Sequence, residues 1–212
     1  MAYNLGDLVS TTQDELDDSS FDASRLKRYA NRTQEEIFTM HDWTFAEAST
    51  TVNLIQGNLS FTVSGATKIE SIKITTDDYE IDLTNNYLPY KVFNNQYPDP
   101  SALNQGSPWI WTYREDTVLL SQPVDQAYAL DVEYQKEPTE LDLDADVPEV
   151  PARHRELMEL GMLMRAQRFN DDYDLALDTE RRFNTKLLST KVADGTKTVK
   201  KHIASVNGRR AA

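Results

Sequence analysis

The spacing of apolar residues changes twice along this chain, and that change restricts its fold more than any other feature. Near both ends, apolar residues recur every three or four positions, which is the period of an amphipathic helix. Between residues 50 and 135 they alternate with polar residues and are rich in β-branched and aromatic types, as in a half-buried strand. The pattern predicts an α+β protein in which helices from both ends form one bundle around an inserted small antiparallel β domain.

This organisation divides the chain into five segments. They are N-terminal helices of the bundle (1–48), the inserted β domain (49–136), an acidic linker (137–150), C-terminal helices of the bundle (151–190) and a basic C-terminal tail (191–212). Within the β domain, Gln56, Gly57 and Asn58 separate two alternating runs and predict a hairpin. The stretch 84–108 is rich in Asn, Pro and Tyr, which predicts a short helix near residues 90–94 and then a long loop.

Charge is distributed unevenly over the chain, whose net charge is −13. From Lys186 onward seven basic residues stand against Asp194 alone, so this end carries +6 and residues 1–185 carry −19. The acidic body weighs against a protein that grips the outside of a nucleic acid, because such binding needs basic groups that neutralise phosphates. The basic end suggests docking onto an acidic partner or a nucleic acid. A disordered, solubilising end is the alternative interpretation.

No residue pattern indicates catalysis, so we expect neither an enzyme nor a cofactor. The chain has no cysteine, its three histidines are far apart, and no common catalytic or phosphate-binding spacing occurs. Asp142, Asp144 and Asp146 resemble part of a calcium loop, but the required glycine and final glutamate are missing, so no metal site is expected. No apolar run approaches the roughly 20 residues that a membrane-spanning helix needs.

An aromatic alternation in the β domain has two interpretations. Trp109, Trp111 and Tyr113 are spaced by two, so on a strand they point the same way. They form either a stacking surface for a carbohydrate or other ligand, or, as we favour, a face buried in the sheet.

The C-terminal helices carry the candidates for a subunit interface. Gly161 predicts close approach of a neighbouring helix. The methionines supply adaptable apolar contacts, and they cannot all face one internal neighbour. A second apolar edge is therefore covered either by the β domain or by another subunit, and the interface candidates are Met158, Met162 and Arg165.

One long run resembles the C-terminal half of tailed-bacteriophage head-to-tail adaptors, also called connector or head-completion proteins. This run is WIWTYREDTVLLSQPVDQAYALDVEYQKEPTELDLDADVPEVPARHRELMELGMLMRAQ. The matching features are Pro123 before a strand ending near Tyr134, Pro138 and Leu141 in the acidic linker, and the helix start from Pro151 to Arg155. NLGDLVSTTQDELDD and RLKRYANRTQEEI resemble the family's first two helices, so the resemblance covers about residues 4–190.

This resemblance implies a structural virion protein made in the host cytoplasm and located in the virion neck. It would form a homo-oligomeric ring, typically a dodecamer, beneath the portal protein, completing the head and seating the tail or nozzle protein below. DNA would pass through its channel without specific binding. The family's C-terminal segment often embraces the portal, which implies portal-binding roles for Lys191, Lys197, Lys200, Lys201, Arg209 and Arg210. Alternatives are another virion ring component, such as a tail-terminator or tail-tube protein, and a carbohydrate- or ligand-binding module.

Overall fold

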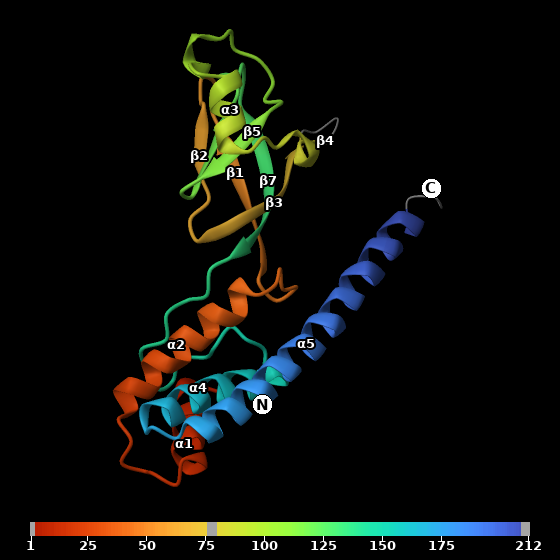
Figure 1. The fold of residues 1–212 in the computed structure, drawn as a ribbon. Helices are drawn as coiled ribbons and strands as arrows, with labels where there is room; N and C mark the ends of the chain where they lie inside the picture. Colours follow the sequence, from red (N-terminus) through yellow and green to blue (C-terminus); the bar gives the residue numbers. More distant parts are fainter. Residues whose placement is uncertain (1–2, 76–79, 209–212) are drawn as a thin grey trace. The chain divides into compact units, whose positions relative to one another are not determined.

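A computed structural model describes residues 3–75 and 80–208, with side chains described except at positions 75, 80 and 196–208. The chain divides into two compact units, one of Met1–Ala46 with Pro138–Ala212 and one of Glu47–Glu137. The first is helical and the second contains the strands (Figure 1). The expected α+β class, with terminal helices in one bundle and an inserted antiparallel β domain, is confirmed.

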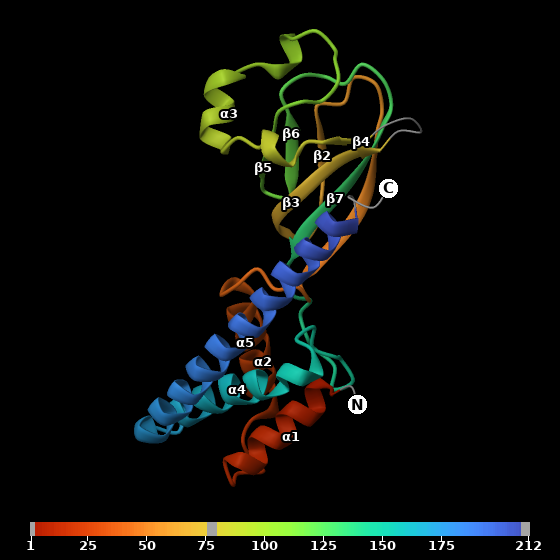
Figure 2. The same ribbon diagram turned by 90° about the vertical axis from the view of Figure 1, so that its right-hand side faces the viewer.

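The helical unit is centred on one helix that contacts the three others. Its elements within the described residues are α1 (Leu5–Glu15), α2 (Ala23–Thr39), a 3-10 turn (Ala152–His154), α4 (Arg155–Phe169) and α5 (Tyr173–Gly208). α4 packs against α1, α2 and α5 (Figure 2). Asn4 and Asp7 form a reciprocal capping box at the start of α1, and the Asp22 side chain accepts a hydrogen bond from the Ser24 amide at the start of α2.

One close helix contact sets the spacing between α2 and α4. A methyl group on Gly161 of α4 would lie 2.3 Å from Cγ2 and 2.9 Å from Oγ1 of Thr33 on α2. The expectation that Gly161 admits a close neighbour is therefore confirmed. Around this contact lies a continuous apolar core that includes Leu26, Trp43 and Phe183. The indole Nε1 of Trp43 donates to the carbonyl of Ile37 at 2.6 Å, so this buried polar atom is satisfied.

The β unit contains two antiparallel sheets among the described residues. Its strands are β1 (Glu47–Leu54), β2 (Ser60–Thr62), β3 (Ala66–Thr75), β4 (Glu80–Asp82), β5 (Trp111–Arg114), β6 (Thr117–Leu120) and β7 (Tyr128–Lys136). One sheet has the order β1-β7-β3-β4 and the other β2-β6-β5. Between β4 and β5 lie two 3-10 turns (Thr84–Asn86 and Pro100–Ala102) and α3 (Tyr90–Gln96), which confirms the predicted short helix.

The hairpin predicted around Gly57 is wrong. β1 pairs with β7 and β2 pairs with β6, so the two strands flanking the turn belong to different sheets. Gly57 does lie in a turn, with φ at +87°. Its amide donates to the carbonyl of Val124 at 2.8 Å, however, a contact with a distant segment that the local turn signal does not contain. By contrast, Glu115 and Asp116 (φ 49° and 61°) form a tight turn that joins β5 to β6 directly.

We predict that Gly161→Ala destabilises the helical unit by about 1–3 kcal/mol, because the added methyl overlaps Thr33 more than alanine's helix preference can offset. Gly195→Ala on α5 is the matched control, since nothing lies within 4 Å of a methyl there, and it should gain roughly 0.5–1 kcal/mol. Urea unfolding followed by circular dichroism at the helical band measures both. Equal stability of Gly161→Ala and the unmodified chain would contradict the close contact.

Candidate functional site

The acidic segment 139–149, here called the acidic strap, is fastened to α2 by side-chain amides. Gln34, buried on α2, donates through Nε2 to the carbonyl of Thr139 at 2.9 Å. Its Oε1 accepts from the amide of Glu149, also at 2.9 Å. The Gln34 side chain thus binds both the first and the last residue of the strap. This segment was expected to be an acidic linker, and the structure shows a loop whose backbone has defined partners on α2.

Two further residues of α2 hold the middle of the acidic strap. Asn31 pairs with both backbone groups of Leu141, donating to its carbonyl and accepting from its amide, each at 2.8 Å. Lys27 donates to the carbonyl of Asp142 at 2.9 Å and pairs with the carboxylate of Asp144 at 2.8 Å. The hydrogen bond to Asp144 raises the pKa of Lys27, so the ammonium group stays charged. Lys27, Asn31 and Gln34 therefore form one polar stripe along α2.

The acidic strap also covers the first turn of α1 (Figure 2). The amide of Leu5 donates to the carbonyl of Asp146 at 2.8 Å, and that of Gly6 to the carbonyl of Asp144 at 2.9 Å. First-turn amides have no partner within their own helix, so the strap satisfies them. The Asp146 carboxylate accepts from the amides of Asp142 and Leu143, and these hydrogen bonds lower the pKa of Asp146.

These contacts leave a defined outer surface on the acidic strap. Leu141 is buried in the helical core, as is Val150 just beyond the strap. Leu143 and Val147 instead point outward, with 64% and 56% of their surface exposed. Exposed carboxylates surround them, including Glu140 and Asp142. An ordered loop that presents aliphatic and acidic groups together is suited to contact with a partner that is basic and apolar.

α5 presents a second surface, with opposite charge. One side of the helix, including Ala176, Phe183 and Leu187, packs onto the helical unit. Another side exposes Leu188 and Val192, at 63% and 71%. The segment 181–193 carries four basic residues and no carboxylate: they are Arg181, Arg182, Lys186 and Lys191.

The end of α5 differs from the sequence-based expectation. The bundle was expected to end at residue 190 and a separate tail to follow, yet the helix continues to Gly208. The buried stripe itself continues past this point, because Thr190 and Asp194 follow Leu187 at helical spacing and are both buried. Buried polar residues at these positions hid the continuation from a search for apolar periodicity.

Asp194 ties α5 to the segment that follows α2. Its two carboxylate oxygens accept from the amide of Thr44 at 2.9 Å and from the Thr44 hydroxyl at 2.6 Å. His41 lies 3.9 Å from the same carboxylate and packs edge-on against Trp43. From the sequence this residue was counted only as a charge, whereas in the structure its carboxylate holds α5 against the segment after α2.

The sequence-predicted portal-binding residues occupy the far part of α5 and the residues after it. Lys191 lies on α5 and is half-buried. Lys197, Lys200 and Lys201 follow on the same helix, in a part where the structure describes the backbone and not the side chains. Arg209 and Arg210 lie outside the described residues. Their role in binding a portal therefore stays a prediction.

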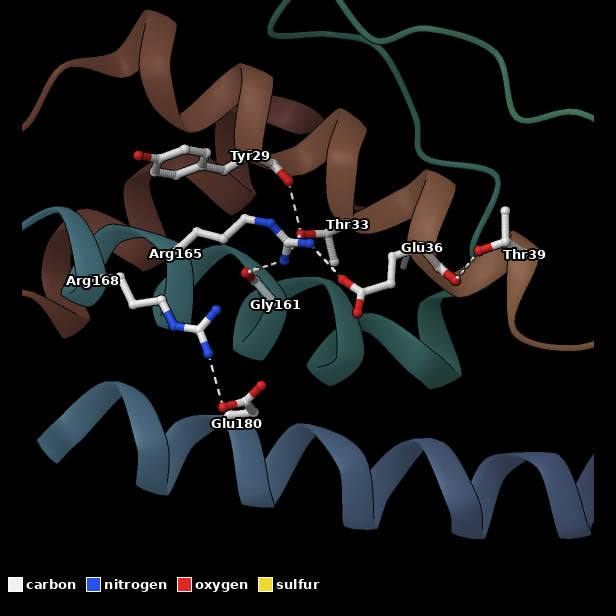
Figure 3. A network of polar contacts seen from close by, with 8 residues as sticks. All are labelled: Tyr29, Thr33, Glu36, Thr39, Gly161, Arg165, Arg168 and Glu180. Carbon is white, nitrogen blue, oxygen red and sulfur yellow. Dashed lines mark hydrogen bonds and ion pairs between the residues drawn. The ribbon is translucent and has the colours of Figure 1, made fainter. Parts of the chain in front are cut away.

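The predicted interface residues on α4 face inward. Met158 and Met162 are fully buried in the core of the helical unit, which leaves them no exposed surface for another copy. Arg165 lies between α4 and α2, where it forms an ion pair with Glu36 and donates to Thr33 at 3.1 Å (Figure 3). Three helices surround α4, so it needs apolar contacts on several sides. This accounts for the presence of methionines on more than one side of the helix.

The three residues of the predicted aromatic alternation differ in burial and do not share one exposed surface. Trp111 is buried, and its Nε1 donates to the carbonyl of Leu83 at 2.8 Å. Tyr113 is partly buried and donates to the carbonyl of Ala66. Trp109 precedes β5 and is exposed. The favoured interpretation, a face buried in the sheet, therefore describes Trp111 and partly Tyr113, and leaves Trp109 outside.

The remaining chemical signals of the sequence indicate no site in the part of the chain that the structure describes. Among the side chains that the structure describes, in residues 3–74 and 81–195, no three His, Cys, Asp or Glu gather so as to hold a metal ion. Two of the three aspartates of the calcium-like pattern bind groups of the protein itself: Asp144 pairs with Lys27, and Asp146 accepts from strap amides. Among the described helices, none combines the length and apolar character needed to cross a membrane.

Comparison with known families matches residues 3–202 to the model of the SU10 adaptor protein family. The chain belongs to this family of phage adaptor proteins. The resemblance to tailed-phage head-to-tail adaptors is thus confirmed. The family is one of structural phage adaptors, which is not a class of enzymes, and membership implies a virion component. The match extends past residue 190 into the basic segment, which the sequence resemblance had left outside. A search of curated proteins found no match.

Sequence reasoning missed the residues that fasten the adaptor's acidic strap. Lys27, Asn31 and Gln34 are spaced by four and three positions, so they share one side of α2. That spacing was a usable signal, because amides aligned on one helix face can bind an extended backbone. The acidic run supplied the matching segment, but nothing in its sequence stated which helix it follows.

We predict that Gln34→Ala destabilises the helical unit by about 1–3 kcal/mol, because the strap's Thr139 carbonyl and Glu149 amide both lose a buried partner. Glu35→Ala, at the neighbouring exposed position of α2, is the matched control and should change stability by less than about 0.5 kcal/mol. Urea unfolding gives the energies, and limited proteolysis tests whether cleavage within 139–149 increases. Unchanged stability and cleavage in Gln34→Ala would show that the strap does not depend on this residue.

Proposed function

We propose that this adaptor forms a ring beneath the portal of the phage head, completes the head after packaging, provides a channel for DNA and seats the tail. The observation that carries the proposal is the family match over residues 3–202. In this proposal the ring is a dodecamer located in the neck of the virion. It binds the portal protein above and a tail or nozzle protein below, and acts without catalysis or a cofactor.

The charge distribution supports passage of DNA through the ring. Residues 1–185 carry a net charge of −19. A polyanion slides past an acidic surface without adhering, because few basic groups are available to neutralise its phosphates.

The basic end of the chain supports attachment to the portal. α5 is anchored to the helical unit through Asp194 and then continues to Gly208, carrying Lys197, Lys200 and Lys201 on its last turns. The family match, over residues 3–202, extends across these three lysines. In a closed ring every copy presents this segment, and the combined attachment is stronger than any single contact.

We predict that a chain ending at Gly195 stays folded but fails to join portal-bearing heads. This end point keeps the Asp194–Thr44 contact and removes five of the seven basic residues that follow residue 185. A full-length variant with Lys197, Lys200 and Lys201 changed to Gln is the matched control, because it removes the charge of these residues without shortening the chain. It should also join heads less well than the unmodified chain. Circular dichroism checks the fold, and electron microscopy of heads mixed with each chain counts occupied portals. Full occupancy by the chain ending at Gly195 would contradict the proposed role of the basic end.

A further inference from the structure

We propose that each copy in the ring contacts the next through two different surfaces. The acidic strap of one copy lies on the basic, apolar side of α5 of its neighbour. This inference rests on the proposed ring and specifies which surfaces join its subunits. It concerns two surfaces of the helical unit that are both exposed within one copy: Leu143 on the strap is 64% exposed and Leu188 on α5 is 63% exposed. Neither surface therefore covers the other in the same molecule.

The apolar residues on α5 lie on one side of the helix. Leu177, Leu188 and Val192 are separated by eleven and four positions, which are close to whole numbers of helical turns. All three are exposed, whereas Ala176, Phe183 and Leu187 face the helical unit. The exposed side thus offers a row of aliphatic contacts for the two outward side chains of the strap, Leu143 and Val147.

Charge selects which part of α5 the strap contacts. The first two turns carry Asp174, Asp178 and Glu180, which would repel an acidic segment. Residues 181–193 carry four basic residues and no carboxylate, and the strap carries five carboxylates and no basic residue. Opposite charges at this density favour encounter and fix the register between surfaces. The strap is therefore expected on Leu188 and Val192 rather than near Leu177.

A hollow beside the apolar row can receive carboxylates. It has a volume of about 370 Å³ and is open to solvent. Its lining residues are Glu156, Arg181, Arg182, Thr185, Lys186 and Ser189. Glu156 is paired with Lys186, which leaves the two arginines as the cationic groups that face an incoming acidic side chain.

A second copy is the occupant that these observations favour. Both complementary surfaces are present on every copy, so each subunit can use its strap toward one neighbour and its α5 toward the other. Such a heterologous contact repeats from copy to copy and closes into a ring when the rotation allows. An eleven-residue strap covers less area than a standard stable interface of about 1,200–2,000 Å², so a single contact is weak and ring closure strengthens it.

Cross-linking between two single-cysteine variants tests this contact, because the chain contains no cysteine of its own. Leu143→Cys and Leu188→Cys are mixed in equal amounts and treated with a short bis-maleimide, either in solution where the unmodified chain forms oligomers or on portal-bearing heads. We expect a cross-linked dimer of the 24.2 kDa chain in the mixture and almost none from either variant alone. Leu143→Cys mixed with Leu175→Cys is the matched control, since Leu175 is exposed on α5 but lies on a different side from Leu177 and Leu188.

A charge swap tests the electrostatic part of the contact. Adding Arg181→Glu and Arg182→Glu to the Leu188→Cys chain should lower the cross-linked fraction by roughly tenfold, because attraction at two positions becomes repulsion. Adding Glu140→Lys and Asp142→Lys to the Leu143→Cys partner should then restore it.

The outcomes separate this inference from the proposed function. Cross-linking in the mixture of the two variants, and not of either variant by itself, supports the contact between the strap and α5. If the unmodified chain assembles but the mixture does not cross-link, or if each variant cross-links with itself equally well, the inference is overturned while the ring stands. If the unmodified chain assembles neither in solution nor on heads, the proposed ring fails and this inference fails with it.

Discussion

The hydrogen bonds between the polar stripe of α2 and the acidic strap are the interaction on which the rest of this structure depends. The acidic strap buries Leu141 in the core, but most of its residues are exposed, so backbone contacts are needed to fix the rest of its course. Asn31 and Gln34 supply them by pairing with both the donors and the acceptors of the strap backbone. Amides suit this task because one side chain both donates and accepts. Without these contacts the strap would be a solvated linker and its exposed carboxylates would have no fixed arrangement.

Fixing the strap also completes the helical unit. Its carbonyls satisfy the first amides of α1, and Leu141 fills part of the core beside α2. α5 is held by the same unit through Phe183 and, further along, through Asp194 and Thr44. The acidic and basic surfaces are therefore both positioned by one hydrophobic core. A protein that joins larger assemblies gains from this arrangement, since surfaces fixed before contact lose less conformational entropy on binding.

The fold was predictable where the spacing of apolar residues shows which side of an element is buried. It was less predictable where contacts of polar residues determine how segments pair. Helical and alternating periods gave the α+β class and the insertion of the β unit, and Gly161 indicated a close helix contact that the structure contains. The Gly57 hairpin failed because distant strands compete for the backbone beside a turn, and a local sequence signal does not include them. The methionine-rich face of α4 was assigned to another subunit because the sequence did not show that three helices surround it. Asp194 was read only as a charge, although its spacing continues the buried stripe of α5.

Amide hydrogen exchange of the isolated, unmodified chain tests the central claim most directly. The amides of Leu141 and Glu149 donate to the side chains of Asn31 and Gln34, at 2.8 and 2.9 Å. The account predicts that both exchange far more slowly than the same residues in an unstructured peptide, with protection that approaches the stability of the helical unit. Exchange of both amides at the unstructured rate, while the amides of α2 and α4 remain protected, would show that the strap is a free linker and would contradict the account.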